Sequence, residues 1–433
     1  MSSARQQAFT CLLHIQKNQS YSNLAIAGVL KENSLPDADK ALFTTLVYGV
    51  VERKLTLDYN LQLYLKQPLK KLNPKAYIAL LLGVYQLLFL DKIPPHAAIN
   101  ESVKLVKSNG AAFASGLVNA VLRKVAAAGL VLPDLAEKST TEEQQQFYSI
   151  QYSVPLFLVK LWWDAYGEET ALGIMQASLG APPLYARVNT TKITAEELTR
   201  RLKEEGVTAE PCSAVENCLL LTGSSAVEKL PSFQEGLFHI QDLSSQLCCA
   251  RLDPSPGDVV LDLCAAPGGK SFTLAERMQG QGTVYSFDLH PHRVKLIADG
   301  AARLGLPNVH PRQGDATLFN KDLEPADKVL VDVPCAGLGI IGRKPEIRYK
   351  DAASIDDLPA LQYNISDIAS SYLKPGGRLV YSTCSLNPAE NEKVVERFLQ
   401  EHPDFHLVRM ETVFPQTYHA DGFFISVLEK MEN

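Results

Sequence analysis

The stretch that most constrains the fold of this 433-residue chain lies over residues 258–278. An apolar run over 258–264 is followed by the paired glycines Gly268 and Gly269 and by a helix-like segment over 270–278. Such a strand, turn and helix start form the ligand-binding corner of an open α/β sheet, because glycine lets the backbone approach a ligand that the helix N–H groups then face. The loop has neither the Gly-x-Gly-x-x-Gly spacing of a dinucleotide site nor the Gly-Lys-Ser/Thr ending of a P-loop. We therefore expect an α/β sheet that binds a different ligand here.

The composition is that of a folded, soluble protein with several domains. Hydrophobic residues make up 46% and charged residues 21% of a chain that exceeds one ordinary core. The N-terminus has no signal-peptide core, and the longest apolar run, Ile78–Leu90, is shorter than the roughly 20 residues that span a bilayer. We therefore expect a cytoplasmic protein with no membrane partner.

The cysteine pattern argues against a metal site, and the net charge argues against general attraction to polyanions. The eight cysteines include no CxxC pair, so we predict free thiols and no metal site. The net charge of −6 argues against general attraction to polyanions, although a local basic face would be enough to bind nucleic acid.

Three segments of the chain differ in periodicity. Residues 1–135 repeat apolar residues at helical spacing without a convincing strand, which predicts an all-α bundle. Residues 136–235 hold linker helices and then the order β-α-β-β-α-β, which predicts a small ferredoxin-like α+β domain. Residues 236–433 alternate strands and helices, which predicts an α/β domain with a mostly parallel, Rossmann-like sheet of seven strands.

The expected elements follow these patterns. The bundle helices are expected at 3–16, 37–53, 55–64, 74–90, 97–107 and 112–127. The middle strands are expected at 184–189, near 209, at 218–221 and at 236–241, with helices at 194–205 and 225–230. The last strands are expected at 258–263, 283–288, 308–313, 327–333, 377–384, 405–410 and 422–428. The final two have no helix between them and are expected to form an antiparallel edge hairpin.

Four acidic residues end consecutive strands of the expected large sheet, where open α/β sheets bind their ligands. They are Asp262, Asp288, Asp315 and Asp332. A carboxylate at Asp288, about twenty residues past the glycine loop, can accept hydrogen bonds from both hydroxyls of a ribose. Asp315 is placed to contact the edge of an adenine. One such Asp is commonly a turn or helix-cap residue, but four beside a Gly-Gly loop favour a nucleoside site.

Two cysteines end neighbouring strands, Cys335 after Asp332-Val333-Pro334 and Cys384 after Ser382-Thr383. Because neighbouring strands lie about 4.8 Å apart, both thiols can reach one small ligand. Methylation of pyrimidine carbon 5 needs such groups: a thiolate adds to carbon 6, carbon 5 then attacks a sulfonium methyl group, and a base removes the carbon 5 proton. Asp332, in its protonated form, is placed to donate to N3. The residues alone leave open which thiol attacks.

Three motifs together resemble the RsmB/Nop/Sun family of RNA cytosine-5 methyltransferases. They are Cys264-Ala-Ala-Pro-Gly-Gly-Lys270, Asp332-Val-Pro-Cys335-Ala-Gly-Leu-Gly339 and Tyr381-Ser-Thr-Cys-Ser385, and the segments 241–246 and 387–392 also match. The resemblance implies a class I methyltransferase domain, S-adenosylmethionine as cofactor, Cys384 as nucleophile and Cys335 as the release residue. It implies cofactor contacts from Cys264, Ala265, Ala266, Pro267, Gly268, Gly269, Lys270, Asp288, Arg293, Asp315 and Asp332. Val333 and Ala336 depart from the common Asp-Ala-Pro-Cys-Ser-Gly form.

The N-terminal segment resembles a second known fold, the NusB-like RNA-binding bundle. The resemblance rests on residues 46–53, 100–103 and 117–123. Such a bundle joined to this catalytic domain is the architecture of family members that methylate 16S rRNA, by resemblance at cytosine 967 in the usual rRNA numbering. We therefore expect a monomer whose partner is 16S rRNA, naked or partly assembled. A tRNA target and a non-catalytic RNA-binding or antitermination module are the alternatives.

Several basic residues are candidates for RNA contact. Lys66, Lys70, Lys71 and Lys75 form one group, for which a solvated face is an equal alternative. Arg343, Lys344, Arg348 and Lys350 follow the Pro-Cys motif and are predicted to contact phosphate. Arg187 and Asn189, on a strand of the middle domain, are further candidates for RNA contact.

Overall fold

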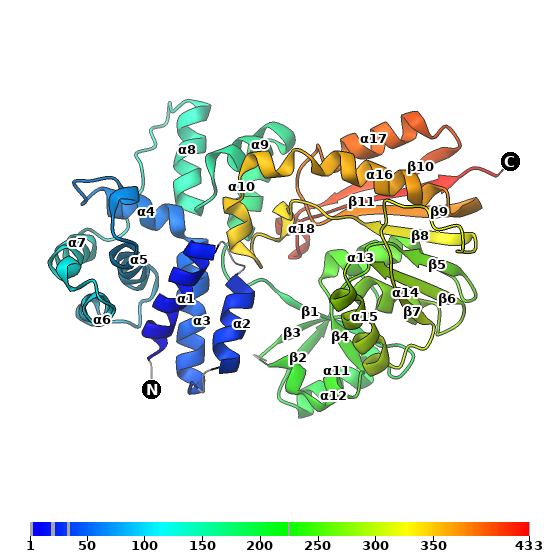
Figure 1. The fold of residues 1–433 in the computed structure, drawn as a ribbon, viewed down its shortest axis with the longest axis horizontal. Helices are drawn as coiled ribbons and strands as arrows, with labels where there is room; N and C mark the ends of the chain where they lie inside the picture. The colour runs from blue at the N-terminus through cyan, green and yellow to red at the C-terminus, as the bar shows by residue number, and fades with distance from the viewer. Residues whose placement is uncertain (1–2, 19–21, 33–34, 224–225, 433) are drawn as a thin grey trace. The chain divides into compact units, whose positions relative to one another are not determined.

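The computed structural model describes residues 3–18, 22–32, 35–223 and 226–432 and divides into two compact units (Figure 1). Unit 1 comprises Met1–Gly180 and Ile341–Lys350, and unit 2 comprises Ala181–Ile340 and Asp351–Asn433. Within the described residues, no helix is long and apolar enough to cross a membrane.

Unit 1 is helical, as predicted. Its elements are α1 (Ala4–Asn18), α2 (Ser22–Glu32), α3 (Asp37–Glu52), α4 (Lys54–Gln62), η1 (Leu69–Lys71), α5 (Pro74–Phe89), α6 (Pro95–Ser108), η2 (Ala112–Ala114), α7 (Ser115–Ala128), α8 (Thr141–Tyr152), α9 (Leu156–Tyr166) and α10 (Glu168–Ala177). The sequence analysis did not predict α2, which buries only Ser22 and Ile26 and therefore shows a weak apolar pattern.

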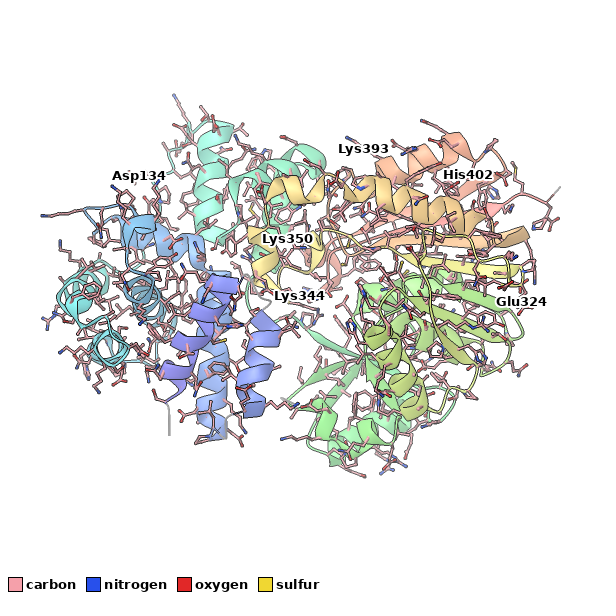
Figure 2. All side chains as sticks on the ribbon, viewed as in Figure 1. Asp134, Glu324, Lys344, Lys350, Lys393 and His402 are labelled. Atoms are coloured by element: carbon pink, nitrogen blue, oxygen red, sulfur yellow. The ribbon has the colours of Figure 1, made fainter. Side chains whose placement is uncertain are left out.

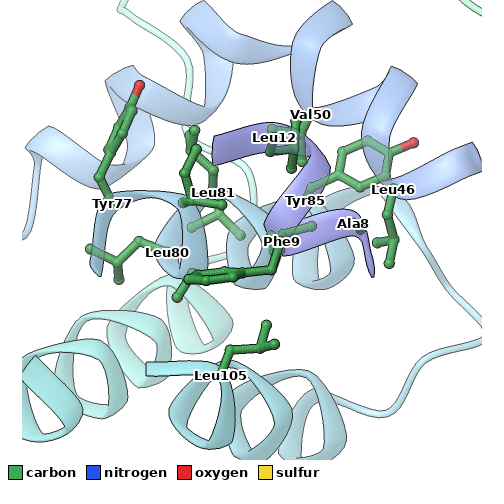
Figure 3. Packing of buried hydrophobic residues seen from close by; sticks show 14 of the residues in the cluster. Ala8, Phe9, Leu12, Leu46, Val50, Tyr77, Leu80, Leu81, Tyr85 and Leu105 are labelled. Carbon is green, nitrogen blue, oxygen red and sulfur yellow. The ribbon is translucent and has the colours of Figure 1, made fainter. Parts of the chain in front are cut away.

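Helix α5 lies at the centre of the core of this unit (Figure 3). It buries every residue from Ala76 to Gln86, and side chains of α1, α3 and α6 pack around it. Tyr85 reaches the backbone of α3, because a Cβ built on Gly49 would lie 2.0 Å from the Tyr85 ring. Tyr85 is therefore a residue of the core.

A segment distant in sequence completes unit 1. Residues 341–350 contain the 3₁₀ turn η5 (Pro345–Tyr349), whose Arg348 is fully buried. Its guanidinium donates to backbone carbonyls at the C-terminal ends of three helices, Glu52 of α3, Ser153 after α8 and Ser178 after α10, each at 3.1 Å. The prediction that Arg348 contacts RNA phosphate is therefore wrong. Lys344 and Lys350 on either side, which Figure 2 labels, are half-buried.

Unit 2 holds two sheets, of which the smaller has the ferredoxin-like order. Its elements are β1 (Leu184–Val188), α11 (Ala195–Glu204), β2 (Thr208–Pro211), β3 (Cys218–Thr222), η3 (Val227–Lys229), α12 (Pro231–Gln234) and β4 (Phe238–Ile240). The antiparallel order β2-β3-β1-β4 confirms the predicted class. The helix expected at 225–230 is instead the turn η3 followed by α12, because Pro231 begins a helix and cannot lie inside one. Ser225 lies outside the described residues.

The larger sheet has seven strands in the order β10-β11-β9-β8-β5-β6-β7. The strands are β5 (Val259–Asp262), β6 (Thr283–Asp288), β7 (Val309–Gln313), β8 (Ala326–Asp332), β9 (Leu373–Thr383), β10 (Phe405–Val413) and β11 (Phe423–Lys430). The helices between or before them are α13 (Leu243–Leu252), α14 (Gly269–Arg277), α15 (Pro291–Leu304), α16 (Leu358–Ser370), α17 (Glu392–Glu401) and α18 (Pro415–Tyr418). The antiparallel pairs β10–β11 and β11–β9 lie at one edge, as predicted for the final hairpin, although the four-residue α18 separates β10 from β11. The predicted fold class is thus confirmed.

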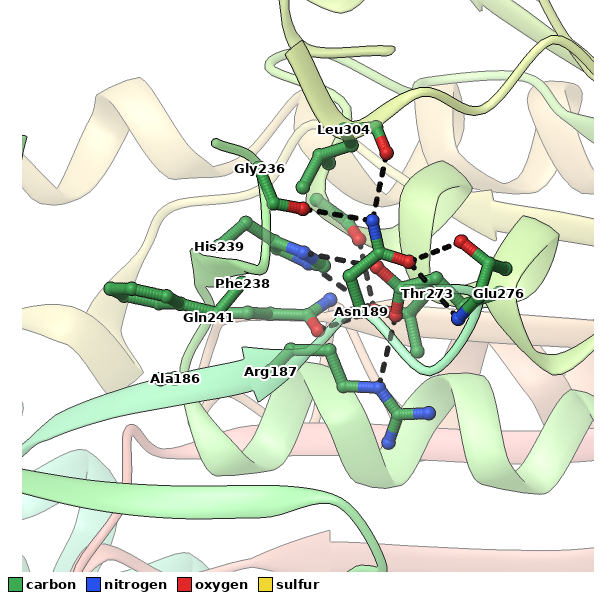
Figure 4. A network of polar contacts seen from close by, with 12 residues as sticks. Ala186, Arg187, Asn189, Gly236, Phe238, His239, Gln241, Thr273, Glu276 and Leu304 are labelled. Atoms are coloured by element: carbon green, nitrogen blue, oxygen red, sulfur yellow. Dashed lines mark hydrogen bonds and ion pairs between the residues drawn. The ribbon is translucent and has the colours of Figure 1, made fainter. Parts of the chain in front are cut away.

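A buried polar network joins the two sheets of unit 2 (Figure 4). Arg187 of β1 is 2% exposed and forms an ion pair at 3.2 Å with the buried Glu276 of α14. Asn189 is fully buried and donates to the carbonyls of Gly236 and Leu304 at 2.9 and 2.8 Å. The predictions that Arg187 and Asn189 contact RNA are therefore wrong, because their polar groups are already satisfied inside the protein.

Candidate active site

The glycine loop joins β5 to α14 at the carboxyl end of the parallel strands, as the sequence predicts. Gly268 has a φ of +112° and donates its backbone N–H to the Ala265 carbonyl at 2.8 Å. A Cβ at this position would lie 2.4 Å from the Phe272 ring, so that only glycine fits both the conformation and the space. The loop therefore passes close to α14 and leaves the first helical N–H groups facing outward.

Two pockets lie beside this loop. One, of about 190 Å³, is lined by Ile240, Gln241, Asp242, Ser245, Asp262, Cys264, Ala265, Ala266, Pro267, Gly269, Lys270 and Asp332. The other, of about 250 Å³, is lined by Leu263, Phe287, Gly314, Asp315, Ala316, Leu318, Phe319, Asn320, Leu323 and Tyr372. The first is rich in charged and backbone groups, whereas the second is mostly apolar and has one carboxylate. This division suits a ligand with a charged end and a flat heteroaromatic end.

Asp288 and Arg293 lie beside the loop. Asp288 is 4% exposed, and its Oδ2 lies 2.9 Å from the Arg293 guanidinium. Arg293 also donates to the carbonyl of Ala266 at 3.0 Å, so that it connects the loop to the end of β6. Most of the loop residues predicted to contact the cofactor line the first pocket with Asp332, Asp315 lines the second, and Asp288 and Arg293 lie beside the loop. Their chemistry fits S-adenosylmethionine: carboxylates for ribose and amino groups, and an apolar pocket for adenine.

Asp315 is held in an ionised form at the wall of the apolar pocket. Its Oδ1 accepts hydrogen bonds from the side chain and the backbone N–H of Thr317, at 2.7 and 2.9 Å. These bonds lower the pKa of Asp315. An ionised carboxylate here can accept a hydrogen bond from an exocyclic amino group such as that of adenine.

Asp262 lies at the bottom of the charged pocket and is fully buried. Its Oδ2 accepts from Ser271 at 2.7 Å, while its Oδ1 has no hydrogen-bond partner within the described structure. Burial raises the pKa of Asp262 from 3.8 to about 7, although the bond from Ser271 acts in the opposite direction. A carboxyl group of this kind is protonated in mildly acidic solution and becomes a buried charge above neutral pH.

This shift predicts a pH-dependent stability. Because the folded-state pKa of Asp262 lies above the unfolded value, ionisation disfavours the folded state, and stability falls as the pH rises from about 4 to about 7. Asp262→Asn removes this dependence. We measure the free energy of unfolding of the ligand-free protein in urea. As the pH rises from 5 to 8, the value for the variant should increase relative to that for wild type. A difference between the two proteins that stays constant over this range would contradict the assignment.

Lys270 and Asp332 form an ion pair across the mouth of the charged pocket. The Lys270 ammonium lies 2.8 Å from Asp332 Oδ2, and Ser382 donates to Asp332 Oδ1 at 2.9 Å. Burial lowers the pKa of Lys270, but the charge and hydrogen bond of Asp332, together with the nearby Cys248 and Cys249, outweigh burial and raise that pKa. Both carboxylate oxygens of Asp332 therefore act as hydrogen-bond acceptors in this structure.

The two cysteines predicted to carry the chemistry lie in contact. The sulfur atoms of Cys335 and Cys384 are 3.2 Å apart, and both thiols are free and partly exposed. The hydrogen bond with Cys384, together with burial, raises the pKa of Cys335 well above its ordinary value. Cys335 is thus held as a neutral thiol that can donate to the sulfur of Cys384.

A buried carboxylate that the sequence analysis gave no role connects the two cysteine loops. Glu390 is fully buried, and its Oε2 accepts from the Ala336 N–H at 2.8 Å and from Gln362 at 3.0 Å. Its Oε1 accepts from Ser385 at 2.7 Å and from Asn387 at 3.1 Å. Ala336 and Ser385 each follow a cysteine, so that one side chain fixes both loops. The family motif at 387–392 was the available signal, although it did not reveal this role.

Comparison with known proteins agrees with this geometry. Three family models match: 16S rRNA methyltransferase RsmB/F over residues 249–429, the NusB family over 2–127, and the RsmF/B-like ferredoxin-like domain over 154–228. The chain is 38% identical to the probable ribosomal RNA small subunit methyltransferase B of Bacillus subtilis, with 99% of each chain covered. It is 32% identical to ribosomal RNA small subunit methyltransferase B of Escherichia coli O1:K1, with 96% of each covered.

Solved structures show the same fold. The crystal structure of the protein PH0851 matches with a TM-score of 0.81 and 27% identity over 99% of this chain and 98% of that one. A methyltransferase homologue from Pyrococcus horikoshii matches with a TM-score of 0.60 and 29% identity, covering 66% of this chain and 99% of that one. The chain therefore belongs to the RsmB/F family of rRNA methyltransferases, enzymes that take the methyl group they transfer from S-adenosylmethionine.

Proposed function

We propose that this protein methylates carbon 5 of one cytosine in 16S rRNA, expected from the family resemblance at position 967, through a covalent adduct with Cys384. The observation that carries the proposal is the contact between Cys335 and Cys384, 3.2 Å apart at the ends of β8 and β9. A transferase acting on an amine or a hydroxyl needs no such pair of thiols. Carbon 5 of a pyrimidine does, because it becomes nucleophilic only after carbon 6 is attacked. Cytoplasmic location and action as a monomer are parts of the same proposal.

Each thiol has a distinct task. S-adenosylmethionine, when bound, supplies an electrophilic methyl group. The Cys384 thiolate forms a bond to carbon 6, and carbon 5 then takes the methyl group. For release, the Cys335 thiol first loses its own proton to solvent and then accepts the carbon 5 proton. The electron pair of that C–H bond re-forms the double bond, and the sulfur of Cys384 leaves carbon 6 as a thiolate. The raised pKa of Cys335 makes its thiolate a strong base.

Asp332 has a different task from the one that the sequence suggests. Donation to N3 requires a protonated carboxyl group, whereas both oxygens of Asp332 already accept hydrogen bonds, from Lys270 at 2.8 Å and from Ser382 at 2.9 Å. A carboxylate accepts from the N4 amino group of cytosine, which uracil lacks. We therefore assign Asp332 to recognition of the base as cytosine, in addition to contact with the cofactor.

A gel assay for covalent protein–RNA adducts tests the proposal. Wild type, Cys335→Ala, Cys384→Ala and the double variant are incubated with S-adenosylmethionine and a 16S rRNA transcript, and RNA methylation is mapped in parallel. We expect a denaturant-stable adduct in Cys335→Ala and none in the double variant. An adduct in Cys384→Ala alone would reverse the roles of the thiols. Full methylation without any adduct would refute the covalent mechanism, and methylation of tRNA in place of 16S rRNA would refute the target.

A further inference from the structure

The helical unit contains two long stretches without an acidic residue. Residues 59–90 and 102–133, 32 residues each, hold no Asp or Glu, although the whole chain carries a net charge of −6. Their eight basic residues are Lys66, Lys70, Lys71, Lys75, Lys104, Lys107, Arg123 and Lys124. Positive charge concentrated in this way in an acidic protein creates a local field that attracts polyanions.

The fold places the two stretches against each other. They contain η1, α5, the second half of α6, η2 and α7, and the three α-helices pack side by side (Figure 1). At one end, Lys75 at the start of α5 donates to the Asn109 carbonyl after α6, at 2.7 Å. Lys70 and Lys71 directly precede α5, and Lys107 lies in the last turn of α6, so these lysines share one end of the bundle. They are exposed, and none pairs with a carboxylate in the part of the chain that the structure describes.

An exposed aromatic ring lies in the same region. Phe113 in η2 follows Asn109 by four residues and is 76% exposed, the largest fraction for any large hydrophobic side chain among the described residues. Leu117, four residues further along in α7, is 38% exposed. An exposed aromatic ring near cations suits the binding of an unpaired base, because every base offers a face for stacking.

We propose that this end of the bundle, defined by Lys70, Lys71, Lys75, Lys107 and Phe113 and called the basic platform, binds a single-stranded segment of the substrate RNA. The lysines contact phosphates, and Phe113 stacks on one unpaired base. This inference rests on the proposed function, because that function makes RNA the substrate. The exposed ring of Phe113 distinguishes the platform from a merely solvated face, because solvation explains surface lysines but not an exposed aromatic ring.

Variants of Phe113 test the stacking contact. Phe113→Leu keeps an apolar side chain without an aromatic face, and Phe113→Trp keeps the face. We expect Phe113→Leu to weaken binding of a fluorescently labelled 16S rRNA transcript roughly 5- to 100-fold, and Phe113→Trp to bind like wild type. The KM for RNA should rise in Phe113→Leu while kcat at saturating RNA stays unchanged. Equal affinity of Phe113→Leu and wild type would overturn the stacking assignment.

Charge reversal tests the phosphate contacts. Lys71→Glu and Lys107→Glu are each expected to reduce the slope of log Kd against log salt concentration by about 0.7 or more, the value for loss of one single-strand phosphate contact. The matched control is Lys138→Glu, an exposed lysine beside Glu137, which should leave the slope unchanged. A platform variant that behaves like the control would overturn the proposal. If wild type methylates no 16S rRNA, the proposed function fails; if it does and all the variants match it, only the basic platform fails.

Discussion

Replacement of Arg348 by methionine is expected to destabilise unit 1 by about 3 kcal/mol. The Arg348 guanidinium is the donor for carbonyls at the C-terminal ends of α3, α8 and α10. The C-terminal end of a helix presents carbonyls without intrahelical partners and carries partial negative charge. A buried cation there donates hydrogen bonds to the carbonyls and compensates the charge. Methionine fills a similar volume but leaves these carbonyls without a donor, at about 1–3 kcal/mol for each one that water cannot reach. Removal of a buried charge offsets part of this loss.

The two tryptophans of the chain make the measurement specific to unit 1. Trp162 and Trp163 both lie in α9, and Trp162 is fully buried, so that fluorescence during urea denaturation follows this unit. Arg348→Lys, which keeps the charge with fewer and less suitably arranged donors, should fall between wild type and Arg348→Met. The same substitution at the exposed Arg123 of α7 is the control and should change stability by less than about 0.5 kcal/mol. An equally small effect at position 348 would contradict the capping role.

Arg348 also shows what could not be predicted from the sequence. In the sequence it is one of four basic residues just after the Pro-Cys motif, which suggested contact with RNA phosphate. Its three helix-end partners lie 170 to 296 residues away, and their unpaired carbonyls leave no pattern of their own in the sequence. Arg187 was misinterpreted for the same reason, since its partner Glu276 lies in another domain. Long-range pairing of a buried charge cannot be predicted from local spacing.

The glycine loop and the strand-end residues were predictable because their signal is local. Gly268 and the acidic residues at strand ends occupy positions that the α/β sheet itself brings to one edge, whatever the rest of the chain does. Cys335 and Cys384 were placed together by the same argument, since β8 and β9 are neighbours. The sequence could not show the ion pair between Lys270 and Asp332, on which the role we propose for that carboxylate rests.

Replacement of Glu390 by glutamine is expected to lower kcat about 100-fold while the KM for RNA changes little. All four hydrogen-bond partners of the Glu390 carboxylate are donors, from Ala336, Gln362, Ser385 and Asn387. An amide in its place turns its NH₂ group either toward Ala336 and Gln362 or toward Asn387 and Ser385, and of these four groups only the Ser385 hydroxyl can simply rotate to accept. The Ala336 N–H cannot turn away, and Gln362 is also bound to the Pro334 carbonyl at 2.9 Å. At least one of the cysteine loops must therefore shift, and a displacement of about 1 Å is enough for a loss of this size.

The experiment must distinguish displacement of the two cysteine loops from a general loss of folded protein. Glu390→Gln should also lose about 1–3 kcal/mol of stability, the range for one unsatisfied buried group, so activity is compared well below the unfolding temperature. In a Cys335→Ala background, Glu390→Gln should slow formation of the Cys384 adduct, whereas a purely structural defect would lower the amount of active protein and leave the rate per active enzyme unchanged. Glu396→Gln, on the exposed face of α17, is the matched control. Adduct formation at the wild-type rate in Glu390→Gln would show that the two loops hold their geometry without this carboxylate. Because Glu390 contacts both loops and neither sulfur atom, a slower rate would show that catalysis depends on how the fold spaces the two thiols as well as on the thiols themselves.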